Sequence, residues 1–223
     1  VETASQAIEA AADSCVTHLL APVWAAVPVP APLDSPADMR VLVAGGTVEQ
    51  REAIVALYPD ARHLEYRPTV AGRDVELNIA EPFDHLVWIA PPSGGTLAEM
   101  ADAQAGGVMH LFSLIRAHLR AGRTLDELSW TIVTLGACAI TAGETLDPTH
   151  AAVHGLAGSM AKEFPHWRVR MLDVARGDVL PVDAIFRAPF DPAGEVLARR
   201  DDVWFHQELL PADWPETDAP AYR

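Results

Sequence analysis

The sequence predicts an α/β fold of the doubly wound class, in which helices cover both faces of a mostly parallel sheet. The main observation is that short apolar runs typical of buried strands alternate with segments of helical periodicity from Met39 onward. The clearest strand is 128–135 (LSWTIVTL), which is rich in β-branched and aromatic residues. A helix follows it, with Asp147 as its N-cap and Pro148 in its first turn.

The other elements are expected in the same alternating order. Residues 4–20 predict an amphipathic helix, and the proline-rich segment 20–33 predicts an extended edge strand or a crossing arm, since proline is tolerated at sheet margins. Residues 195–209 predict a hairpin whose turn is RRDD. The remaining strands are expected at 39–46, 63–66, 75–79, 85–90 and 167–174, and the remaining helices at 48–59 and 103–120.

The charge of the chain excludes some classes of partner. A formal net charge of −15 repels phosphate backbones and anionic headgroups, so we expect neither a nucleic acid nor a membrane partner. Apolar runs stay well short of the roughly 20 residues that span a bilayer, and the amino-terminal segment is acidic, so we expect a cytoplasmic protein. Cys15 and Cys138 have no CxxC partner, which favours two ordinary buried thiols over a disulfide or zinc site.

Cofactor and catalytic motifs are incomplete. Gly45 and Gly46 stand where a dinucleotide fold keeps its glycine fingerprint, but the third glycine is missing. Glu49 would also oppose a pyrophosphate at the start of the helix, so a simple tight turn is the preferred interpretation. Hydride transfer on this fold needs a tyrosine followed four residues later by a lysine, and none of the three tyrosines has that partner. We therefore expect no catalytic and no cofactor-binding residue.

Three further pairs of residues have a structural or a functional interpretation. His150 and His154 are four apart on one helix and could share a metal, but a third ligand is missing, so surface or capping histidines and no metal site are expected. In the same helix Gly155 and Gly158 predict a close approach of another backbone. Trp24 and Trp214 lie in proline-containing segments near the chain ends and are candidates for contact with a partner.

Three segments, in this order and spacing, resemble a known family. They are LSWTIVTLGACAI, ETLDPTHAAVHGLAGSMAKEFPHWRVRMLDV and VLARRDDVWFHQELLP, and the opening LLAPVWAAVPVP adds to the likeness. Together they resemble the amino-terminal structural subdomain of a modular polyketide synthase ketoreductase. The middle segment is most similar to versions from synthases with a separately encoded acyltransferase.

The resemblance implies a truncated Rossmann-like fold over residues 21–211, with a helix or linker at 1–20 and a linker at 212–223. In the family, the nucleotide-binding glycines and the reducing residues belong to a second, catalytic subdomain. NADPH is therefore expected there, and this chain is expected to be a non-catalytic scaffold that stabilises it.

The partners implied are that catalytic subdomain, neighbouring synthase domains and an acyl carrier protein. Trp24, Val203, Trp204 and Phe205 are the candidate docking residues, because the proline-rich arm and the hairpin would supply apolar edges. Two alternatives stay open at this point. One is a pseudo-ketoreductase that acts as an interaction or spacing module, and the other is an independent short-chain dehydrogenase.

Overall fold

The computed structural model describes residues 19–28, 38–64, 81–93, 95–123, 127–177 and 179–213. The chain divides into two compact units, a large one of Ala26–His206 and a small one of Val1–Ala25 with Gln207–Arg223. Cys15, Trp214, the predicted strand over 75–79 and the predicted helix over 4–20, up to residue 18, lie outside the described residues.

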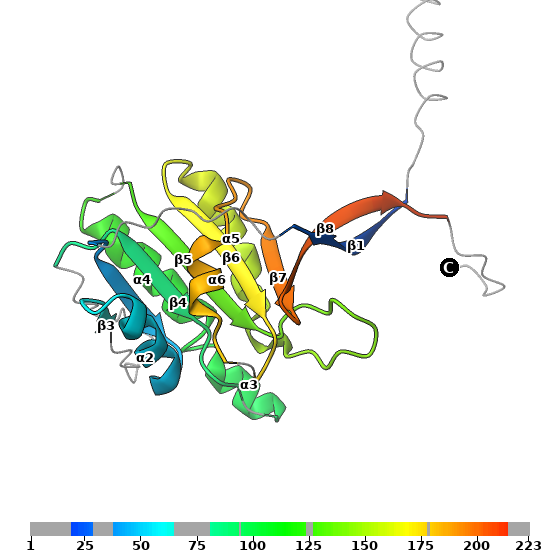
Figure 1. The fold of residues 1–223 in the computed structure, drawn as a ribbon, viewed down its shortest axis with the longest axis horizontal. Helices are drawn as coiled ribbons and strands as arrows, with labels where there is room; N and C mark the ends of the chain where they lie inside the picture. Colours follow the sequence, from blue (N-terminus) through cyan, green and yellow to red (C-terminus); the bar gives the residue numbers. More distant parts are fainter. Residues whose placement is uncertain are drawn as a thin grey trace, which may run out of the picture. The chain divides into compact units, whose positions relative to one another are not determined.

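The predicted α/β class is confirmed (Figure 1). The strands form one eight-stranded sheet in the order β1-β8-β7-β6-β5-β4-β2-β3. Neighbours from β3 to β7 are parallel, and β8 is antiparallel to β7. The strands are β1 (Leu20–Val27), β2 (Val41–Gly45), β3 (Arg62–Leu64), β4 (His85–Ile89), β5 (Ser129–Leu135), β6 (Arg168–Val174), β7 (Val196–Arg200) and β8 (Val203–Pro211). The helices are α2 (Val48–Leu57), α3 (Leu97–Ala103), α4 (Val108–Arg120), the 3-10 turn η1 (Pro148–His150), α5 (Ala152–Glu163) and α6 (Val182–Arg187).

Two apolar layers hold the parallel strands between helices. Alternate side chains of a strand point to opposite faces, and both faces here are covered, so β4 is buried at all five positions. On one face α4 and α5 pack through residues such as Leu111 and Val153. On the other face α2 and α6 pack through Ile54 and Ile185 (Figure 1). This two-sided burial explains why the strands appear in the sequence as continuous apolar runs.

One expected helix is wrong in its extent. Residues 103–120 were expected to form a single helix, but α3 ends at Ala103 and α4 begins at Val108. Gly107 lies between them with ψ −118°, outside the helical region, and its notional Cβ would meet the Nδ1 atom of His150 at 2.5 Å. Glycine is therefore needed at this position, and the helix is interrupted there.

The predicted hairpin is confirmed. β7 and β8 pair antiparallel, and the turn between them places Asp201 and Asp202 at φ 46° and 65°. Aspartate tolerates this left-handed region better than most residues, because its short side chain can bond locally. An ion pair from Arg199 to Asp202 closes the turn.

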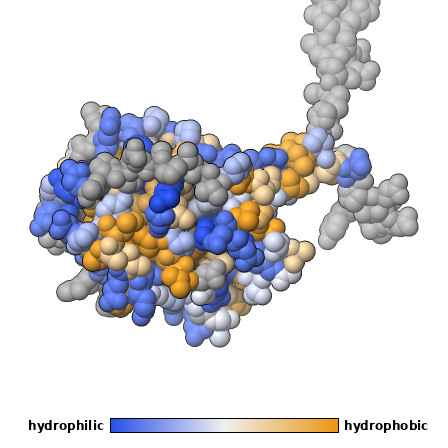
Figure 2. All heavy atoms as spheres, in the orientation of Figure 1, coloured by the Kyte–Doolittle hydropathy of each residue, from blue (hydrophilic) through white to orange (hydrophobic). Residues whose placement is uncertain are grey.

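The small unit contains most of the ribbon that β1 and β8 form. The backbone N–H of Ala212 donates to the carbonyl of Leu19 at 2.9 Å, and β1 is an edge strand of the sheet. Figure 2 shows apolar side chains along this ribbon, and the exposed ones include Leu20, Leu209 and Leu210. The predicted extended edge strand is thus present as β1, while residues 29–33 of the predicted arm lie outside the described residues.

Candidate functional site

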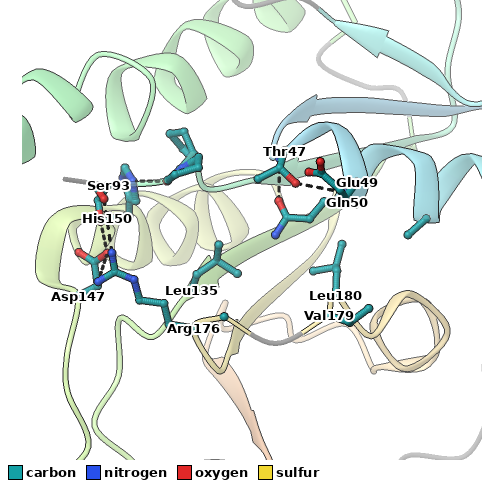
Figure 3. Close-up of a pocket in the computed structure, with 14 residues that line it drawn as sticks. Thr47, Glu49, Gln50, Ser93, Leu135, Asp147, His150, Arg176, Val179 and Leu180 are labelled. Carbon is teal, nitrogen blue, oxygen red and sulfur yellow. Dashed lines mark hydrogen bonds and ion pairs between the residues drawn. The ribbon is translucent and has the colours of Figure 1, made fainter. Parts of the chain in front are cut away.

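A crevice lies at the carboxyl ends of the parallel strands in the large unit (Figure 3). Strand β3, which follows β2 in the chain, pairs with one edge of β2, and β4, which comes next among the described strands, pairs with its other edge. The strand order therefore reverses between β2 and β4. Open α/β sheets bind their ligands at such a reversal. The crevice has a volume of about 440 Å³ and is lined by Thr47, Glu49, Gln50, Ala53, Pro91, Pro92, Ser93, Leu135, Asp147, His150, Arg176, Gly177, Val179 and Leu180.

The two glycines after β2 have a structural explanation. Gly45 has φ +77°, and a Cβ there would come within 2.1 Å of the carbonyl oxygen of Ile89 in the neighbouring strand. The N–H of Gly46, at φ +68°, donates to that same oxygen at 3.0 Å. Both glycines therefore form the tight turn after β2 and its contact with β4, which agrees with the tight turn that the sequence predicts.

The amino end of α2 is occupied by side chains of its own segment. Thr47 caps the helix by accepting from the N–H of Gln50 at 3.3 Å, and the Gln50 side chain accepts from the N–H of Thr47 at 2.8 Å (Figure 3). Hydrogen bonds from its own backbone and from Thr47 lower the pKa of Glu49, whose carboxylate therefore stays charged. The amides of Thr47 and Gln50 therefore already have partners, and the negative charge of Glu49 lies beside them, which opposes a pyrophosphate at this helix start.

The opposite end of the crevice is built around the buried carboxylate of Asp147. Ser93 donates to Oδ2 of Asp147, and the N–H of Thr149 donates to Oδ1 at 3.1 Å. Arg176 approaches Oδ2 at 3.4 Å and is itself half exposed (Figure 3). Burial raises the pKa of Asp147, but these hydrogen bonds and the charge of Arg176 outweigh it, so the pKa lies below its usual value. The predicted role of Asp147 as a cap is confirmed, although it caps η1.

His150 and His154 face different partners. His150 is 5% exposed, and its Nε2 atom lies 3.0 Å from the carbonyl oxygen of Pro91. His154 lies against Thr134 and Cys138. The expectation of surface histidines is wrong, because η1 places His150 and α5 places His154 toward the interior, where burial lowers the pKa of both. Of the two glycines in this helix, Gly158 approaches the carbonyl of Gly194, as predicted, whereas Gly155 has open space around it.

Cys138, His154 and Asp173 bring their donor atoms within 4.8 Å of one another. The carboxylate of Asp173 can only accept, so Thr134 donates its hydroxyl proton to it at 2.6 Å. His154 then donates from Nε2 to Thr134 at 2.9 Å, which leaves Nδ1 to accept from the thiol of Cys138 at 3.8 Å. Burial raises the pKa of Cys138 to about 12, which agrees with a protonated thiol.

Asp173 has no acceptor position left for a metal ion. Its Oδ1 also accepts from the N–H of Ala137 at 2.9 Å, and Oδ2 accepts from the N–H of Cys138 at 3.2 Å and from Arg200 at 2.8 Å. Arg200 donates further to Glu144 and to the carbonyl of Cys138. This network, which we call the Asp173–Arg200 network, fastens the loop after β5 to β6 and β7, so its role is structural.

The candidate docking residues differ in their surroundings. Trp204 is 2% exposed and belongs to the core of the large unit, so it is not available to a partner. Val203 is 40% exposed beside the hairpin turn, and Phe205 is partly buried. Trp24 is partly buried in the small unit. Docking at Val203, Phe205 and Trp24 stays a prediction.

The reversal of strand order, the glycine turn after β2 and the crevice at the carboxyl edge define a domain of the Rossmann type. Residues 22–205 match the family described as "Polyketide synthase extender module SpnB, Rossmann fold domain", and the chain belongs to this family. The predicted relationship to the structural subdomain of a polyketide synthase ketoreductase is confirmed.

Two curated relatives come from Bacillus subtilis (strain 168). Polyketide synthase PksM is 36% identical over 199 residues, which cover 86% of this chain and 5% of PksM. Polyketide synthase PksN is 35% identical over 198 residues, which cover 86% of this chain and 4% of PksN. The chain thus spans about one-twentieth of the length of these relatives.

Solved structures support the fold. "Structure of A1-type ketoreductase" is 21% identical with a TM-score of 0.63, and the match covers 89% of this chain and 43% of that one. "Adenylation, ketoreductase, and pseudo Asub multidomain structure of a keto acid-selecting NRPS module" is 15% identical with a TM-score of 0.67, covering 86% of this chain and 18% of that one. No helix in the described part of the chain has the length and apolar character needed to cross a membrane.

Proposed function

We propose that this chain is the non-catalytic scaffold subdomain of a cytoplasmic polyketide synthase ketoreductase. In this proposal it stabilises the catalytic subdomain, which binds NADPH and reduces the β-keto group of a polyketide held by an acyl carrier protein. The observation that carries the proposal is the amino end of α2. Its capping box and the charge of Glu49 take the position where a Rossmann fold binds pyrophosphate. A chain that retains this sheet without its cofactor contact is suited to support a second half.

The outer face of α4 and α5 is a candidate surface for that second half. On α4, Met109 is 56% and Phe112 is 41% exposed, and positions three apart lie on the same side of a helix. The guanidinium of Arg116 lies over the ring of Phe112 at 5.6 Å. On the adjacent α5, Gly155 and Ser159 are exposed and small. An apolar helix beside a helix with small exposed side chains lets two helices of the catalytic subdomain pack closely against the pair.

The test uses matched charge substitutions on opposite faces of the sheet. The variant Met109→Glu/Phe112→Glu changes the α4 face, and Val48→Glu/Val55→Glu changes α2 at positions that are 53% and 41% exposed. Each chain is mixed with a separately produced catalytic half, and both association and NADPH-dependent reduction of a β-ketoacyl thioester are measured. We expect the α4 variant to lose at least about tenfold in association, which is about 1.4 kcal/mol. The α2 variant should behave like the unmodified chain.

Three results would contradict this proposal or part of it. Reduction of the thioester by the unmodified chain alone would show that it is catalytic. Equal association of both variants would remove the α4–α5 face from the proposal, provided that denaturant unfolding shows both variants to be as stable as the unmodified chain. If the catalytic half is fully active and soluble without this chain, the scaffold role itself fails.

A further inference from the structure

A scaffold role leaves the crevice at the carboxyl ends of the strands unexplained. Its volume of about 440 Å³ lies within the range of small-molecule sites, which is roughly 300–1,000 Å³. Apolar groups from several separate elements form its middle, and they include Ala53 of α2, Pro92 after β4, Leu135 at the end of β5 and Leu180 before α6. The crevice is therefore suited to a compact ligand with an apolar body.

A hydrogen-bond donor lies at one end of the crevice and a hydrogen-bond acceptor at the other. The side chain of Arg176 is 52% exposed, and within the described residues its contacts to Asp147 and to the carbonyl of Ser93 are both long at 3.4 Å. A guanidinium has five N–H donors, so Arg176 retains donors for a ligand acceptor. The carboxylate of Glu49 is fully exposed at the other end and can accept from a ligand donor (Figure 3). A ligand that uses both ends needs acceptors as well as donors.

The charge of the crevice selects against anions. Glu49 and Asp147 contribute two negative charges and Arg176 one positive charge, which leaves a formal charge of −1 among the lining residues. The whole chain adds a field of the same sign at −15. The amides of Thr47 and Gln50 at the start of α2 already donate within their own segment. A phosphate group would therefore meet the negative charge of the crevice and a helix terminus whose donors are partly used.

We propose that this crevice binds an uncharged nitrogen heterocycle of nucleoside size, bearing hydrogen-bond donors and acceptors, and discriminates against its phosphorylated forms. The ring packs on the apolar middle formed by Leu135 and Leu180. Its acceptors face Arg176 and its donors face Glu49. This binding is separate from the NADPH site expected in the catalytic subdomain and does not depend on the scaffold role.

Adenosine and AMP form a matched pair of probes, because they share the ring and differ in the phosphate. The full chain labelled with ¹⁵N is titrated with each probe, and backbone amide shifts are followed. We expect adenosine to shift amides around the crevice saturably, with weak affinity, and AMP to bind several times more weakly. Glu49→Gln, which removes one negative charge, should raise the affinity for AMP relative to that for adenosine about threefold.

Two tryptophan variants locate the binding. Val179 lines the crevice and is 87% exposed, so Val179→Trp fills its mouth without disturbing the core. Leu97 is 86% exposed and is not one of the lining residues, so Leu97→Trp is the matched control. Binding of adenosine should be lost in the first variant and kept in the second. The proposal is overturned if adenosine causes no saturable shift, if both variants bind equally, or if AMP binds as tightly as adenosine.

Discussion

Removing the cation of the Asp173–Arg200 network is expected to destabilise the fold strongly. In Arg200→Met the carboxylate of Asp173, which is fully buried, and that of Glu144, which is 17% exposed, lose their common partner. Burial lowers the pKa of Arg200, but the hydrogen bonds and charges of these two carboxylates outweigh it and raise the pKa, so the guanidinium is charged at every working pH. Breaking a buried ion pair by removing one partner costs about 3–5 kcal/mol.

This cost corresponds to a fall in Tm of about 6–20 °C, since 1 kcal/mol shifts Tm by about 2–4 °C for a chain of this length. Denaturant unfolding followed by tryptophan fluorescence gives the free energy, and calorimetry gives Tm. Arg40→Met is the matched control, because the Arg40–Asp84 pair is exposed, with side chains 53% and 44% accessible. Its midpoint should stay close to that of the unmodified chain. A loss of less than about 1 kcal/mol in Arg200→Met would refute the structural role of the network.

Three further measurements test the glycine turn after β2, the thiol of Cys138 and the buried imidazole of His110. Gly45→Ala forces a Cβ to within 2.1 Å of the Ile89 carbonyl and should cost at least about 2 kcal/mol in denaturant unfolding, whereas Gly155→Ala, in open space on a helix, should gain about 0.5–1 kcal/mol. Cys138, whose pKa burial raises to about 12, should react with iodoacetamide at pH 8 at least about tenfold more slowly than glutathione, as followed by peptide mass spectrometry. His110 of α4 is 1% exposed, and burial lowers its pKa to about 4, so its contribution to stability is complete above its unfolded pKa of about 6.5 and is lost as pH falls toward 4. Unfolding measured from pH 7 to 4 should show a loss of about 3 kcal/mol from this group, and a flat profile would contradict the burial of a neutral imidazole.

The strands of the parallel sheet could be predicted from the sequence because each is buried on both faces. The runs at 41–45 and 85–89 are apolar at nearly every position, and the run at 129–135 combines apolar residues with threonines, which also favour strands. Connections through helices make such strands parallel. The hairpin of β7 and β8 could also be predicted, because the charged segment RRDD separates a short apolar run from a second run that begins with valine and two aromatic residues. In each case the signal is local, within about ten residues.

The break between α3 and α4 was missed for a physical reason. The apolar spacing continues across it, while the need for glycine at position 107 comes from His150, which is distant in sequence. The available signal was the Gly106–Gly107 pair, together with Thr96 and Glu99, which form a capping box at the start of α3. Helix α6 was missed because it is only six residues long and lies between prolines, so the helical spacing of its three buried residues extends over little more than one turn.

The site was less predictable than the fold. The broken glycine fingerprint and the opposing charge of Glu49 could be recognised from the sequence, because both lie in one turn. The crevice could not be predicted, since it combines residues from five parts of the chain. The Asp173–Arg200 network was equally hidden, because Asp173 lies inside an apolar strand and its partner is 27 residues away. An acidic residue at the carboxyl end of a buried strand was the one available signal.

We propose that this chain supports a cofactor-binding half without binding the cofactor itself. Isothermal titration calorimetry with NADPH tests it most directly, first on the chain alone and then on its mixture with a ketoreductase catalytic half. We expect no saturable heat from the chain alone, because Glu49 and the capped start of α2 oppose a pyrophosphate there, and tight binding in the mixture. Saturable NADPH binding by the chain alone would contradict the proposed scaffold role.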